Sequence, residues 1–536
     1  MKNIIKVFLV LVFLTPCLFV SSCTDLEEEV YTGIKAEDFR PDEKDIGLLL
    51  VPAYNPVRNL KIGWNGHREM MMESADIMVV PVRERGWFYD GGIFHRLHRH
   101  NWTSTDGHHN SVWNHSWRVI NTCNRLTYQI ESGEITLGAD LETKVLNELR
   151  GLRAYAYYII LDSHGNIPIS TDFADPEPPQ QYSRKDAFDF VVKELLDVLP
   201  NLETEVSSRT YGRFTKWAAH ATLSKLYLNA EVYSGTPMWQ QVIDNCDHIL
   251  ASGNFAMADD YKEPFLTDNH NSSEIIFSVV NDESESSPNF QFHYKNHHPN
   301  FRFVKNLEGS PFGGGSGTPQ FVDTYDSDDS RKEKTWVMGP QYHFQTGEQV
   351  LTYYRHIASL GGAFGPDATN EDGYKPEKYE IKIGARRGLS NDFVIFRYTD
   401  VLMMKAEALL RSGSADQAAE IVTTVRERAF RDTPEKALVT GAELQQGSVY
   451  NYGYQNEHGE ITNPEGGDDI QYGRFMDELG WEFALEGRRR QDLIRFGVFH
   501  TKSWFNHEPS GIEKIIFPIP ERAMQTNPNL VQNPGY

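Results

Sequence analysis

Cysteine is scarce in this chain, which has four among its 536 residues. Cys17 and Cys23 lie in or just after an apolar N-terminal segment, while Cys123 and Cys246 are far apart in the sequence. A disulfide framework needs several pairable cysteines, and a structural zinc site needs ligands at a defined close spacing. The sequence therefore favours neither a disulfide-stabilised domain nor a zinc module.

Basic side chains are also few, with 52 Lys and Arg against 75 Asp and Glu and a formal net charge of −23. Binding to nucleic acid needs a basic surface that neutralises phosphates. We therefore expect no nucleic acid partner. The simplest interpretation of the negative charge is that it keeps an exposed surface soluble.

The N-terminus carries a long apolar run, Val7 to Val20, which is interrupted at only two positions. Lys2 and Lys6 precede the run, and it is too short to span a membrane, so the pattern predicts a secretory signal peptide. The run ends at Val20-Ser21-Ser22-Cys23, which resembles the lipobox where bacterial lipoproteins are cleaved and acylated.

Cleavage at this point would remove residues 1–22 and leave 50 basic against 75 acidic side chains, a net charge of −25. Because stable anchoring needs more than one acyl chain, a multiply acylated Cys23 would hold the mature chain at a membrane. The acidic residues that follow resemble the signal that sends lipoproteins of some Gram-negative bacteria to the outer face of the outer membrane: Asp25, Glu27, Glu28 and Glu29.

Amphipathic helices arranged in pairs dominate the rest of the chain. Apolar residues between Tyr398 and Leu409 follow the i, i+3, i+4 spacing of a helix that starts near Val394 and ends at Gly413. Ser414 predicts the cap of a second helix. Pairs joined by a Gly turn resemble tetratricopeptide units, which stack into a solenoid. The other expected helices are 146–161 with 186–199, 216–233 with 239–250, and a long one over 471–496.

Residues 253–393 lack this periodicity and are rich in aromatic residues, Gly, Asn and Pro. We expect them to form an irregular lobe against the solenoid, with Glu274 to Val280 as a buried strand. No long Pro/Ser linker separates two halves, which favours one large domain. The predicted domain covers 23–536, with a helical scaffold mainly in 139–252 and 394–497 and ligand-facing loops mainly in 50–120 and 253–393.

Several stretches, which together cover nearly the whole chain, form specific motifs. The most specific is the C-terminal ending, Ile516-Phe-Pro-Ile-Pro-Glu521 followed by Asn527-Pro-Asn-Leu530 and Gln532-Asn-Pro-Gly-Tyr536. The others are Arg150-Gly-Leu-Arg-Ala-Tyr155, the segment Phe396 to Ala408, and Glu478 to Gly487 with Arg488 to Arg495. These motifs resemble those of the SusD/RagB-like family of outer-membrane nutrient-binding lipoproteins.

The resemblance implies a mainly α fold, in which a tetratricopeptide-like solenoid of about four helix pairs carries an irregular, loop-rich lobe with a few short strands. It also implies a cell-surface lipoprotein that captures oligosaccharide or polysaccharide and delivers it to a SusC-like TonB-dependent transporter of the outer membrane. Members of the family bind and are not enzymes, so no catalytic residue, cofactor or metal is expected.

A sugar ring presents a flat apolar face, so a glycan site needs exposed aromatic rings flanked by side chains that hydrogen-bond hydroxyls. The loop from Asp76 to Asp90 fits this description. Trp87 and Tyr89 lie there among Gly and Pro residues, with no periodic pattern that would bury them. The family commonly offers a ring in this loop, which favours Trp87 as the platform, with Asp76 or Arg83 bonding to the sugar. The alternative is a Trp packed under its own loop.

A second aromatic cluster lies in the lobe, where every second residue from Phe290 to Tyr294 is aromatic. This alternation also fits one buried face of a strand. The family places binding aromatics in this part of the chain, so we expect Phe290 and Tyr294 to contact ligand. Trp336 and Arg386 are further candidates of the same kind.

Other conspicuous patterns favour structural roles. The histidines between His95 and His115 lack the spacing of a metal site. The Asp-rich run 323–329 lacks the Gly and closing Glu of a calcium loop and predicts a capped turn. Gly313 to Gly317 lacks the Lys-Ser/Thr of a phosphate loop and predicts a flexible hinge or loop. An i, i+4 ion ladder on one helix face is predicted for Glu478, Glu482, Glu486, Arg489 and Arg490.

Two other functions remain open. A lid that captures peptides is compatible with the resemblance, because some members of the family serve peptide importers. A lipid-anchored glycoside hydrolase would need two carboxyl groups roughly 5 to 9.5 Å apart on either side of the sugar. None of the acids that the sequence places falls in a recognisable catalytic motif.

Overall fold

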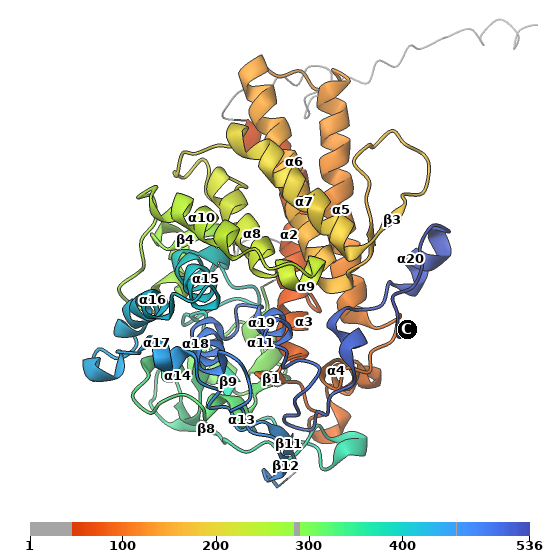
Figure 1. The fold of residues 1–536 in the computed structure, drawn as a ribbon. Coiled ribbons are helices and arrows are strands. Elements are labelled where there is room, and N and C mark those ends of the chain that lie inside the picture. The colour runs from red at the N-terminus through yellow and green to blue at the C-terminus, as the bar shows by residue number, and fades with distance from the viewer. Residues whose placement is uncertain (1–44, 283–289, 457) are drawn as a thin grey trace, which may run out of the picture.

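The structure, a computed structural model, describes residues 45–282, 290–456 and 458–536. The signal peptide, Cys23 and the acidic stretch after it lie outside these residues. No helix in the described ranges is both long and apolar enough to cross a membrane. The elements are mainly α-helices, supplemented by pairs of short antiparallel strands (Figure 1).

Two long helices, α5 (Gly107–Glu131) and α6 (Ala139–His164), pack against each other along one side of the molecule (Figure 1). Helix α2 (Ile46–Ile62) packs on both of them, and α7 (Arg184–Val198) packs on α6. The expected helices 146–161 and 186–199 are therefore confirmed, although α6 begins earlier. Helix α7 begins where the Ser183 hydroxyl accepts a hydrogen bond from the Asp186 N–H, a side-chain N-cap.

The next helices continue the stack. Helix α8 (Lys216–Leu228) pairs with α10 (Trp239–Leu250), and α10 also packs on α15 (Tyr398–Arg411), which pairs with α16 (Ala415–Glu427) (Figure 1). Fully buried alanines, among them Ala218 and Ala406, allow close approach at these contacts. A break at Asn229 separates α8 from a short α9 (Ala230–Ser234). The predicted tetratricopeptide-like solenoid is confirmed.

The helix expected from Val394 begins four residues later. Residues Phe393–Arg397 form strand β10, which pairs antiparallel with β4 (Ile275–Val279), the strand predicted over 274–280. Phe393 and Val394 are both buried, because a strand between packed elements hides both of its faces. Ser414 is the N-cap residue of the following helix, as predicted, but its side chain makes no capping hydrogen bond.

The single helix expected over 471–496 is two helices, α18 (Gly473–Phe483) and α19 (Arg489–Arg495). Leu485 and Gly487 between them have φ values of 68° and 76°, in the left-handed region that ends a helix. A Cβ on Gly487 would lie 2.9 Å from the Cα of Arg68, so the close approach of this loop also requires glycine. The predicted ion ladder is therefore wrong, because Glu486 lies beyond the helix.

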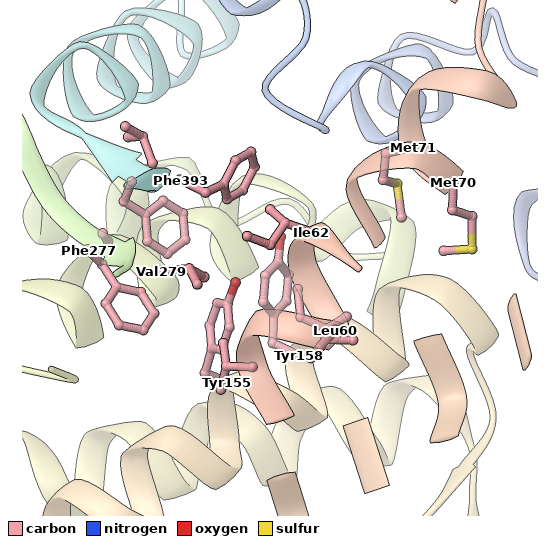
Figure 2. Packing of buried hydrophobic residues seen from close by; sticks show 14 of the residues in the cluster. Leu60, Ile62, Met70, Met71, Tyr155, Tyr158, Phe277, Val279 and Phe393 are labelled. Carbon is pink, nitrogen blue, oxygen red and sulfur yellow. The ribbon is translucent and has the colours of Figure 1, made fainter. Parts of the chain in front are cut away.

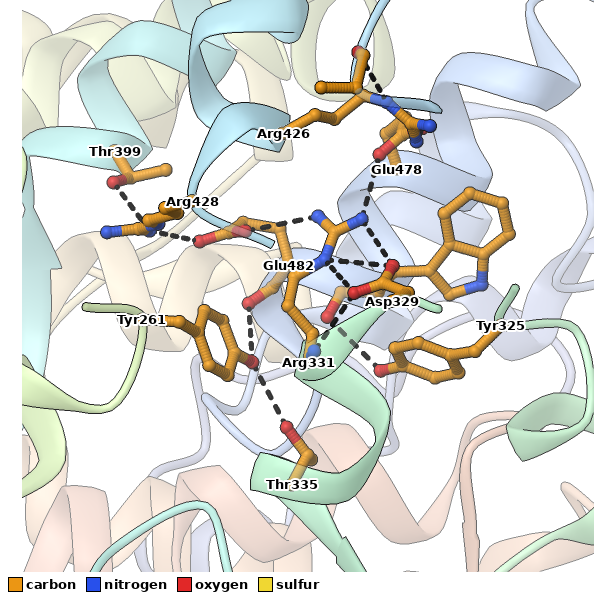
Figure 3. A network of polar contacts seen from close by, with 12 residues as sticks. Tyr261, Tyr325, Asp329, Arg331, Thr335, Thr399, Arg426, Arg428, Glu478 and Glu482 are labelled. Atoms are coloured by element: carbon orange, nitrogen blue, oxygen red, sulfur yellow. Dashed lines mark hydrogen bonds and ion pairs between the residues drawn. The ribbon is translucent and has the colours of Figure 1, made fainter. Parts of the chain in front are cut away.

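The acidic residues of this region instead bind arginines from other elements in a buried network (Figure 3). Glu482 on α18 pairs with Arg428, at 2.6 Å, and with Arg331 of α14 (Ser330–Thr335) in the lobe, at 3.1 Å. Glu478 pairs with Arg474 of its own helix at 2.8 Å, and with Arg426 and Arg331. The arginines hold the pKa of both Glu478 and Glu482 at about 2, against the opposing effect of burial. The network joins the lobe to the solenoid.

A continuous apolar core connects the N-terminal helices with the β4–β10 sheet (Figure 2). It combines aromatic rings from α6 and the sheet with aliphatic and sulfur-containing side chains from α2 and α3 (His67–Glu73). The sheet of the lobe therefore shares one apolar core with the helices. The residues drawn and labelled are Leu60, Ile62, Met70, Met71, Tyr155, Tyr158, Phe277, Val279 and Phe393.

The lobe and the connecting segments contain the remaining short elements, as predicted for an irregular, loop-rich region. The strand pairs are β1 (Met78–Val79) with β5 (Ser316–Gly317), β2 (Ile167–Pro168) with β3 (Gln181–Tyr182), β6 (Trp336–Val337) with β9 (Lys375–Pro376), β7 (Gly339–Tyr342) with β8 (Gln349–Tyr353), and β11 (Gly453–Gln455) with β12 (Ile461–Pro464). The short helices are α4 (Ile93–His98), α11 (Phe292–Asn296), α12 (Phe301–Lys305), α13 (Pro319–Val322), α17 (Gly441–Leu444) and α20 (Glu521–Thr526).

Two loop predictions have different outcomes. The capped turn in the Asp-rich run is confirmed, because the Asp329 carboxylate accepts the Arg331 N–H at 2.9 Å and caps α14. The prediction at Gly313 to Gly317 is confirmed in part, because Gly313 to Gly315 form a loop before β5 but are too closely packed to act as a flexible hinge. A Cβ on Gly315 would lie 2.5 Å from the Asn296 side chain, and one on Gly317 would lie 2.6 Å from the Trp336 ring. These glycines are buried and allow close packing.

Candidate ligand-binding site

The loop that follows β1 folds back on itself in a tight turn. The N–H of Arg83 donates to the carbonyl of Trp87 at 2.7 Å, and the N–H of Trp87 donates to the carbonyl of Arg83 at 3.1 Å. Arg85 and Gly86 between them have φ values of 64° and 76°, and Phe88 has a φ of 64°. Non-glycine residues seldom adopt such values, so the surrounding structure must hold this loop in place.

Arg83 holds this loop in place. Its side chain is not exposed to a ligand. Its guanidinium is fully buried and donates to the Gly314 carbonyl at 2.6 and 3.0 Å, to the Thr369 carbonyl at 2.6 Å and to the Ser316 hydroxyl at 2.8 Å. Burial lowers its pKa to about 10, so it stays cationic at neutral pH. The predicted role of Arg83 in bonding to a sugar is wrong because no ligand can reach it.

Asp76 is likewise buried and engaged. Its two carboxylate oxygens accept hydrogen bonds from Arg489 at 2.8 and 2.7 Å, and one also accepts from the Tyr452 hydroxyl at 3.1 Å. This bidentate ion pair joins the start of the loop to α19. The predicted contact of Asp76 with ligand is therefore wrong.

Trp87 and Tyr89 are exposed, with 56% and 51% of their surfaces accessible. The Trp87 indole is nevertheless fixed in orientation, because its Nε1–H donates to the backbone carbonyl of Phe312 at 2.9 Å. The alternative of a Trp packed under its own loop is wrong, since the neighbouring Phe88 occupies that buried position. A ring that is open to solvent and held by its edge is the arrangement that stacking on a flat ligand needs.

Two further rings extend this surface. Phe312 is half-buried, and the exposed Trp64 lies edge-on to it, with ring centroids 6.1 Å apart and planes at 67°. The guanidinium of Arg387 lies 5.6 Å from the Phe312 ring centroid, and its Nε–H donates to the Gln291 side chain at 2.9 Å. We name Trp64, Trp87, Phe312, Gln291 and Arg387 the aromatic shelf.

Buried residues support the shelf from below. Lys295 lies 5.4 Å from the Trp64 ring centroid and is held by Glu69 and Glu73 of α3 at 2.8 and 2.6 Å. The Phe312 N–H donates to the Tyr294 carbonyl at 2.6 Å. The shelf is thus part of the rigid structure and does not depend on side chains ordering at the moment of binding.

The lobe aromatics chosen from the sequence are buried. Phe290 packs against Tyr379 and Phe393, with centroids 4.9 and 5.8 Å away, and Trp336 packs beneath Gly317. Tyr294 is buried, and its hydroxyl oxygen accepts the Gly309 N–H at 2.6 Å. The predicted ligand contacts of Phe290, Tyr294 and Trp336 are therefore wrong.

One alternative drawn from the sequence in this region is wrong, and one candidate stays untested. Residues Phe292–Asn296 are a short helix, α11, so the alternation of aromatics does not mark a strand face. Arg386 is exposed beside Arg387 of the aromatic shelf. Its contact with ligand stays a prediction.

The histidines of 95–115 have structural roles where they are buried. His95, His98 and His100 each bond through Nε2 to a backbone carbonyl, of Leu360 at 2.7 Å, Phe505 at 2.6 Å and Ser74 at 2.8 Å. Burial lowers the pKa of His98 to about 4, so the ring is neutral. Among the residues that the structure describes, no three His, Cys, Asp or Glu side chains are grouped to hold a metal ion.

Comparison with known proteins identifies the family of this chain. The model of the SusD family matches residues 252–536, more than half of the sequence. This chain belongs to the SusD family. A second family model, described as starch-binding and associating with the outer membrane, matches residues 70–228.

Individual relatives are distant in sequence but match over most of their length. SusD-like protein P25 of Formosa agariphila is 23% identical, with 99% of each chain covered. The starch-binding protein SusD of Bacteroides thetaiotaomicron is 22% identical, over 73% of this chain and 72% of its own. A solved structure of surface glycan-binding protein A from Bacteroides thetaiotaomicron, in complex with laminarihexaose, has a TM-score of 0.67 at 17% identity, covering 91% of this chain and 99% of that one. The SusD fold is thereby shown.

Sequence reasoning missed four members of the shelf in this SusD-family chain: Trp64, Gln291, Phe312 and Arg387. Trp64 lies in Gly63-Trp64-Asn65-Gly66, so the rule that selected Trp87, an aromatic residue in a Gly-punctuated polar loop, could have found it. Phe312 precedes the glycine run and could have been found the same way. Gln291 and Arg387 carry no local signal, because only the fold brings them beside Phe312.

Proposed function

We propose that the protein captures oligosaccharides on the aromatic shelf and performs no chemistry on them. The observation that carries this proposal is the exposed Trp87 ring, which its hydrogen bond to Phe312 fixes in orientation. A fixed, solvent-open indole offers an apolar face to the C–H groups of a pyranose without an entropic cost of ordering. The family assignment and the glycan-binding names of relatives support the same ligand class.

Polar groups beside the rings suit hydroxyl recognition. Arg387 presents several donors in a planar fork, and Gln291 presents an amide that both donates and accepts. Arg85 and Tyr89 are exposed on the neighbouring turn. An array of rings flanked by forked donors favours a sugar chain over an extended peptide, whose recognition relies on main-chain pairing with a sheet edge or on a hydrophobic groove.

The direct test is calorimetry with a panel of neutral oligosaccharides, including laminarihexaose, maltoheptaose, cellohexaose and xylohexaose. We expect at least one to bind with a dissociation constant of about 0.1 to 1 mM, equivalent to roughly 4 to 5.5 kcal/mol. No new reducing ends should appear on prolonged incubation. Turnover that follows the purified protein would favour the hydrolase, and binding of peptides alone would favour the peptide-capturing lid.

We further propose that acylated Cys23 anchors the protein to the outer membrane facing the cell exterior, and that it delivers the glycan to a SusC-like TonB-dependent transporter. The lipobox, the acidic stretch after it and a family described as associating with the outer membrane support this proposal. Purification from native membranes in mild detergent should recover such a transporter in stoichiometric amount. Recovery of the protein without any transporter would contradict the partnership.

A further inference from the structure

The two tryptophan rings of the aromatic shelf are held in different ways. The Trp87 indole is fixed by its Nε1–H, which donates to the Phe312 carbonyl at 2.9 Å. Trp64 lies in the short turn between α2 and α3, and within the described residues its indole nitrogen makes no such bond. Its ring is contacted instead by Phe312, edge-on, and by the ammonium of Lys295.

The side chain of Lys295 joins the Trp64 turn to α3. Its Nζ lies 5.4 Å from the Trp64 ring centroid and donates to the carboxylates of Glu69 and Glu73, at 2.8 and 2.6 Å. The Glu69 oxygen that accepts the ammonium also accepts the backbone N–H of Asn65, at 2.8 Å. One carboxylate oxygen therefore connects Lys295 to the residue that follows Trp64.

The backbone of Lys295 is bound to the other half of the shelf. Its carbonyl accepts the N–H of Gly314 at 2.7 Å, and the Gly314 carbonyl accepts the Arg83 guanidinium at 2.6 and 3.0 Å. Arg83 in turn exchanges two backbone hydrogen bonds with Trp87. A continuous series of bonds thus runs from the Trp64 turn through Lys295 to Trp87.

The charge of Lys295 is costly where it lies. Its side chain and those of Glu69 and Glu73 are almost wholly buried, and a buried ion cluster stabilises a fold little more than apolar residues of similar volume. Burial lowers the pKa of Lys295, but the two carboxylates outweigh this effect and raise it above its usual value. The ammonium therefore stays charged, and it attracts the faces of Trp64 and of the buried Phe94, whose centroid is 5.0 Å away.

We propose that Lys295 is a positioning residue for ligand capture, which fixes the Trp64 ring relative to Trp87 so that both rings contact one oligosaccharide. The inference rests on the proposed function, because it concerns the same shelf. Lys295 touches no ligand itself, since its side chain is buried. Two fixed rings can add their contacts without a further cost of ordering, whereas a displaced Trp64 would lose its share and leave that of Trp87 intact.

The test is a double-mutant cycle, measured by calorimetry with the tightest binder among the four oligosaccharides named above. Trp64→Ala should weaken binding about fivefold, the value of one aromatic contact. Lys295→Met, which keeps an unbranched side chain without the charge, should weaken binding by a similar factor. The double variant should bind no more weakly than either single variant, because Lys295 acts through Trp64. A general structural role would make the two losses multiply.

Fluorine NMR of ligand-free protein labelled with 5-fluorotryptophan follows the ring directly. The Trp64 resonance, assigned from Trp64→Phe, should move in Lys295→Met, while that of Trp239 on α10 stays fixed. If Lys295→Met does not fold, Glu69→Gln takes its place in both measurements, with changes in the same direction. The matched control is Glu148→Gln, which removes a buried carboxylate paired with Arg213 and should keep wild-type affinity.

The outcomes separate this inference from the proposed function. Wild-type affinity in a folded Lys295→Met, no loss in Trp64→Ala, or multiplying losses in the double variant would each overturn the role of Lys295 while capture on the shelf stands. Binding of none of the four oligosaccharides to the wild-type protein would overturn both.

Discussion

The indole of Trp87 donates a hydrogen bond to the backbone carbonyl of Phe312, 225 residues further along the chain, at 2.9 Å. The bond joins the turn after β1 to the glycine-rich segment of the lobe and leaves the Trp87 face open to solvent. Because the Trp87 ring is held at its edge, its orientation is fixed. Its face stays exposed and available for stacking.

Replacing Trp87 by Ala should weaken oligosaccharide binding by roughly tenfold or more, since one decade corresponds to about 1.4 kcal/mol. The melting temperature should stay within a few degrees of wild type, because the ring is exposed. Trp87→Phe keeps a ring but loses the hydrogen bond to Phe312 and should have an intermediate affinity. Tyr342→Ala, which removes an equally exposed ring on β7, is the control and should bind as wild type. Unchanged affinity in a stable Trp87→Ala would place the platform elsewhere.

Gly314→Ala should disturb the same site from beneath. A Cβ at this position would lie 2.6 Å from the buried Phe88 ring and 2.9 Å from the Lys295 carbonyl, so the turn that carries Trp87 must move. We expect urea unfolding to show a loss of about 1 to 3 kcal/mol, typical of overpacking, together with weaker binding. Gly47→Ala, where a Cβ meets nothing within 4 Å, should lose neither stability nor affinity.

Asp76→Ala distinguishes a structural carboxylate from a ligand contact. It leaves Arg489 buried without its partner, which should cost about 3 to 5 kcal/mol in the free energy of unfolding. Asp189→Ala breaks the exposed pair with Lys185 on α7 and should leave stability unchanged. If Asp76→Ala instead keeps its stability and loses affinity, the carboxylate contacts ligand after all.

Asp477 should make stability depend on pH. Its buried carboxyl group accepts hydrogen bonds from the Ser448 hydroxyl at 2.5 Å and the Val449 N–H at 2.8 Å, and burial raises its pKa to about 7. In the unfolded chain the pKa is about 3.9, so between these values the folded state holds a proton that the unfolded state has lost. The unfolding free energy should therefore fall as pH rises from about 4 to about 7, by up to roughly 1.4 kcal/mol per unit.

Asp477→Asn carries no titrating proton and should lack this contribution. The measurement is the difference in unfolding free energy between wild type and Asp477→Asn at several pH values in that window. A difference that does not change with pH would mean that Asp477 is ionised in the folded protein.

Cys23→Ala should abolish acylation and release the protein from the membrane fraction. Wild-type protein on intact cells should be removed by added protease. Deletion of 25–29 should leave the protein membrane-bound but protected from protease. Full protection of the wild type would show that the surface location is wrong.

Local patterns predicted the helices and the exposure of the Trp87 ring, because each depends on residues that are close together in the sequence. The i, i+3, i+4 spacing that predicted α15 needs only one face of a helix to be buried. The Gly- and Pro-punctuated loop around Trp87 signalled exposure because no periodic partner could cover the ring. The C-terminal segment 516–536 signalled the family directly.

Charged residues were one source of error, because their partners are distant in the chain. Asp76 and Arg489 are 413 residues apart, and Arg83 bonds to carbonyls more than 200 residues away. A charged side chain in a polar loop has the same local sequence whether it meets water, a ligand or a buried counterion. Glu482 was assigned to a local ladder for the same reason.

The sequence by itself determined the helical scaffold, the family and the exposure of Trp87. Only the tertiary structure decided that Asp76, Arg83, Phe290, Tyr294 and Trp336 are buried supports, and that Trp64, Phe312 and Arg387 join Trp87 on one surface. The physical reason is that helix formation follows from spacing along the chain, whereas burial and charge pairing depend on which distant segments the folded chain brings together.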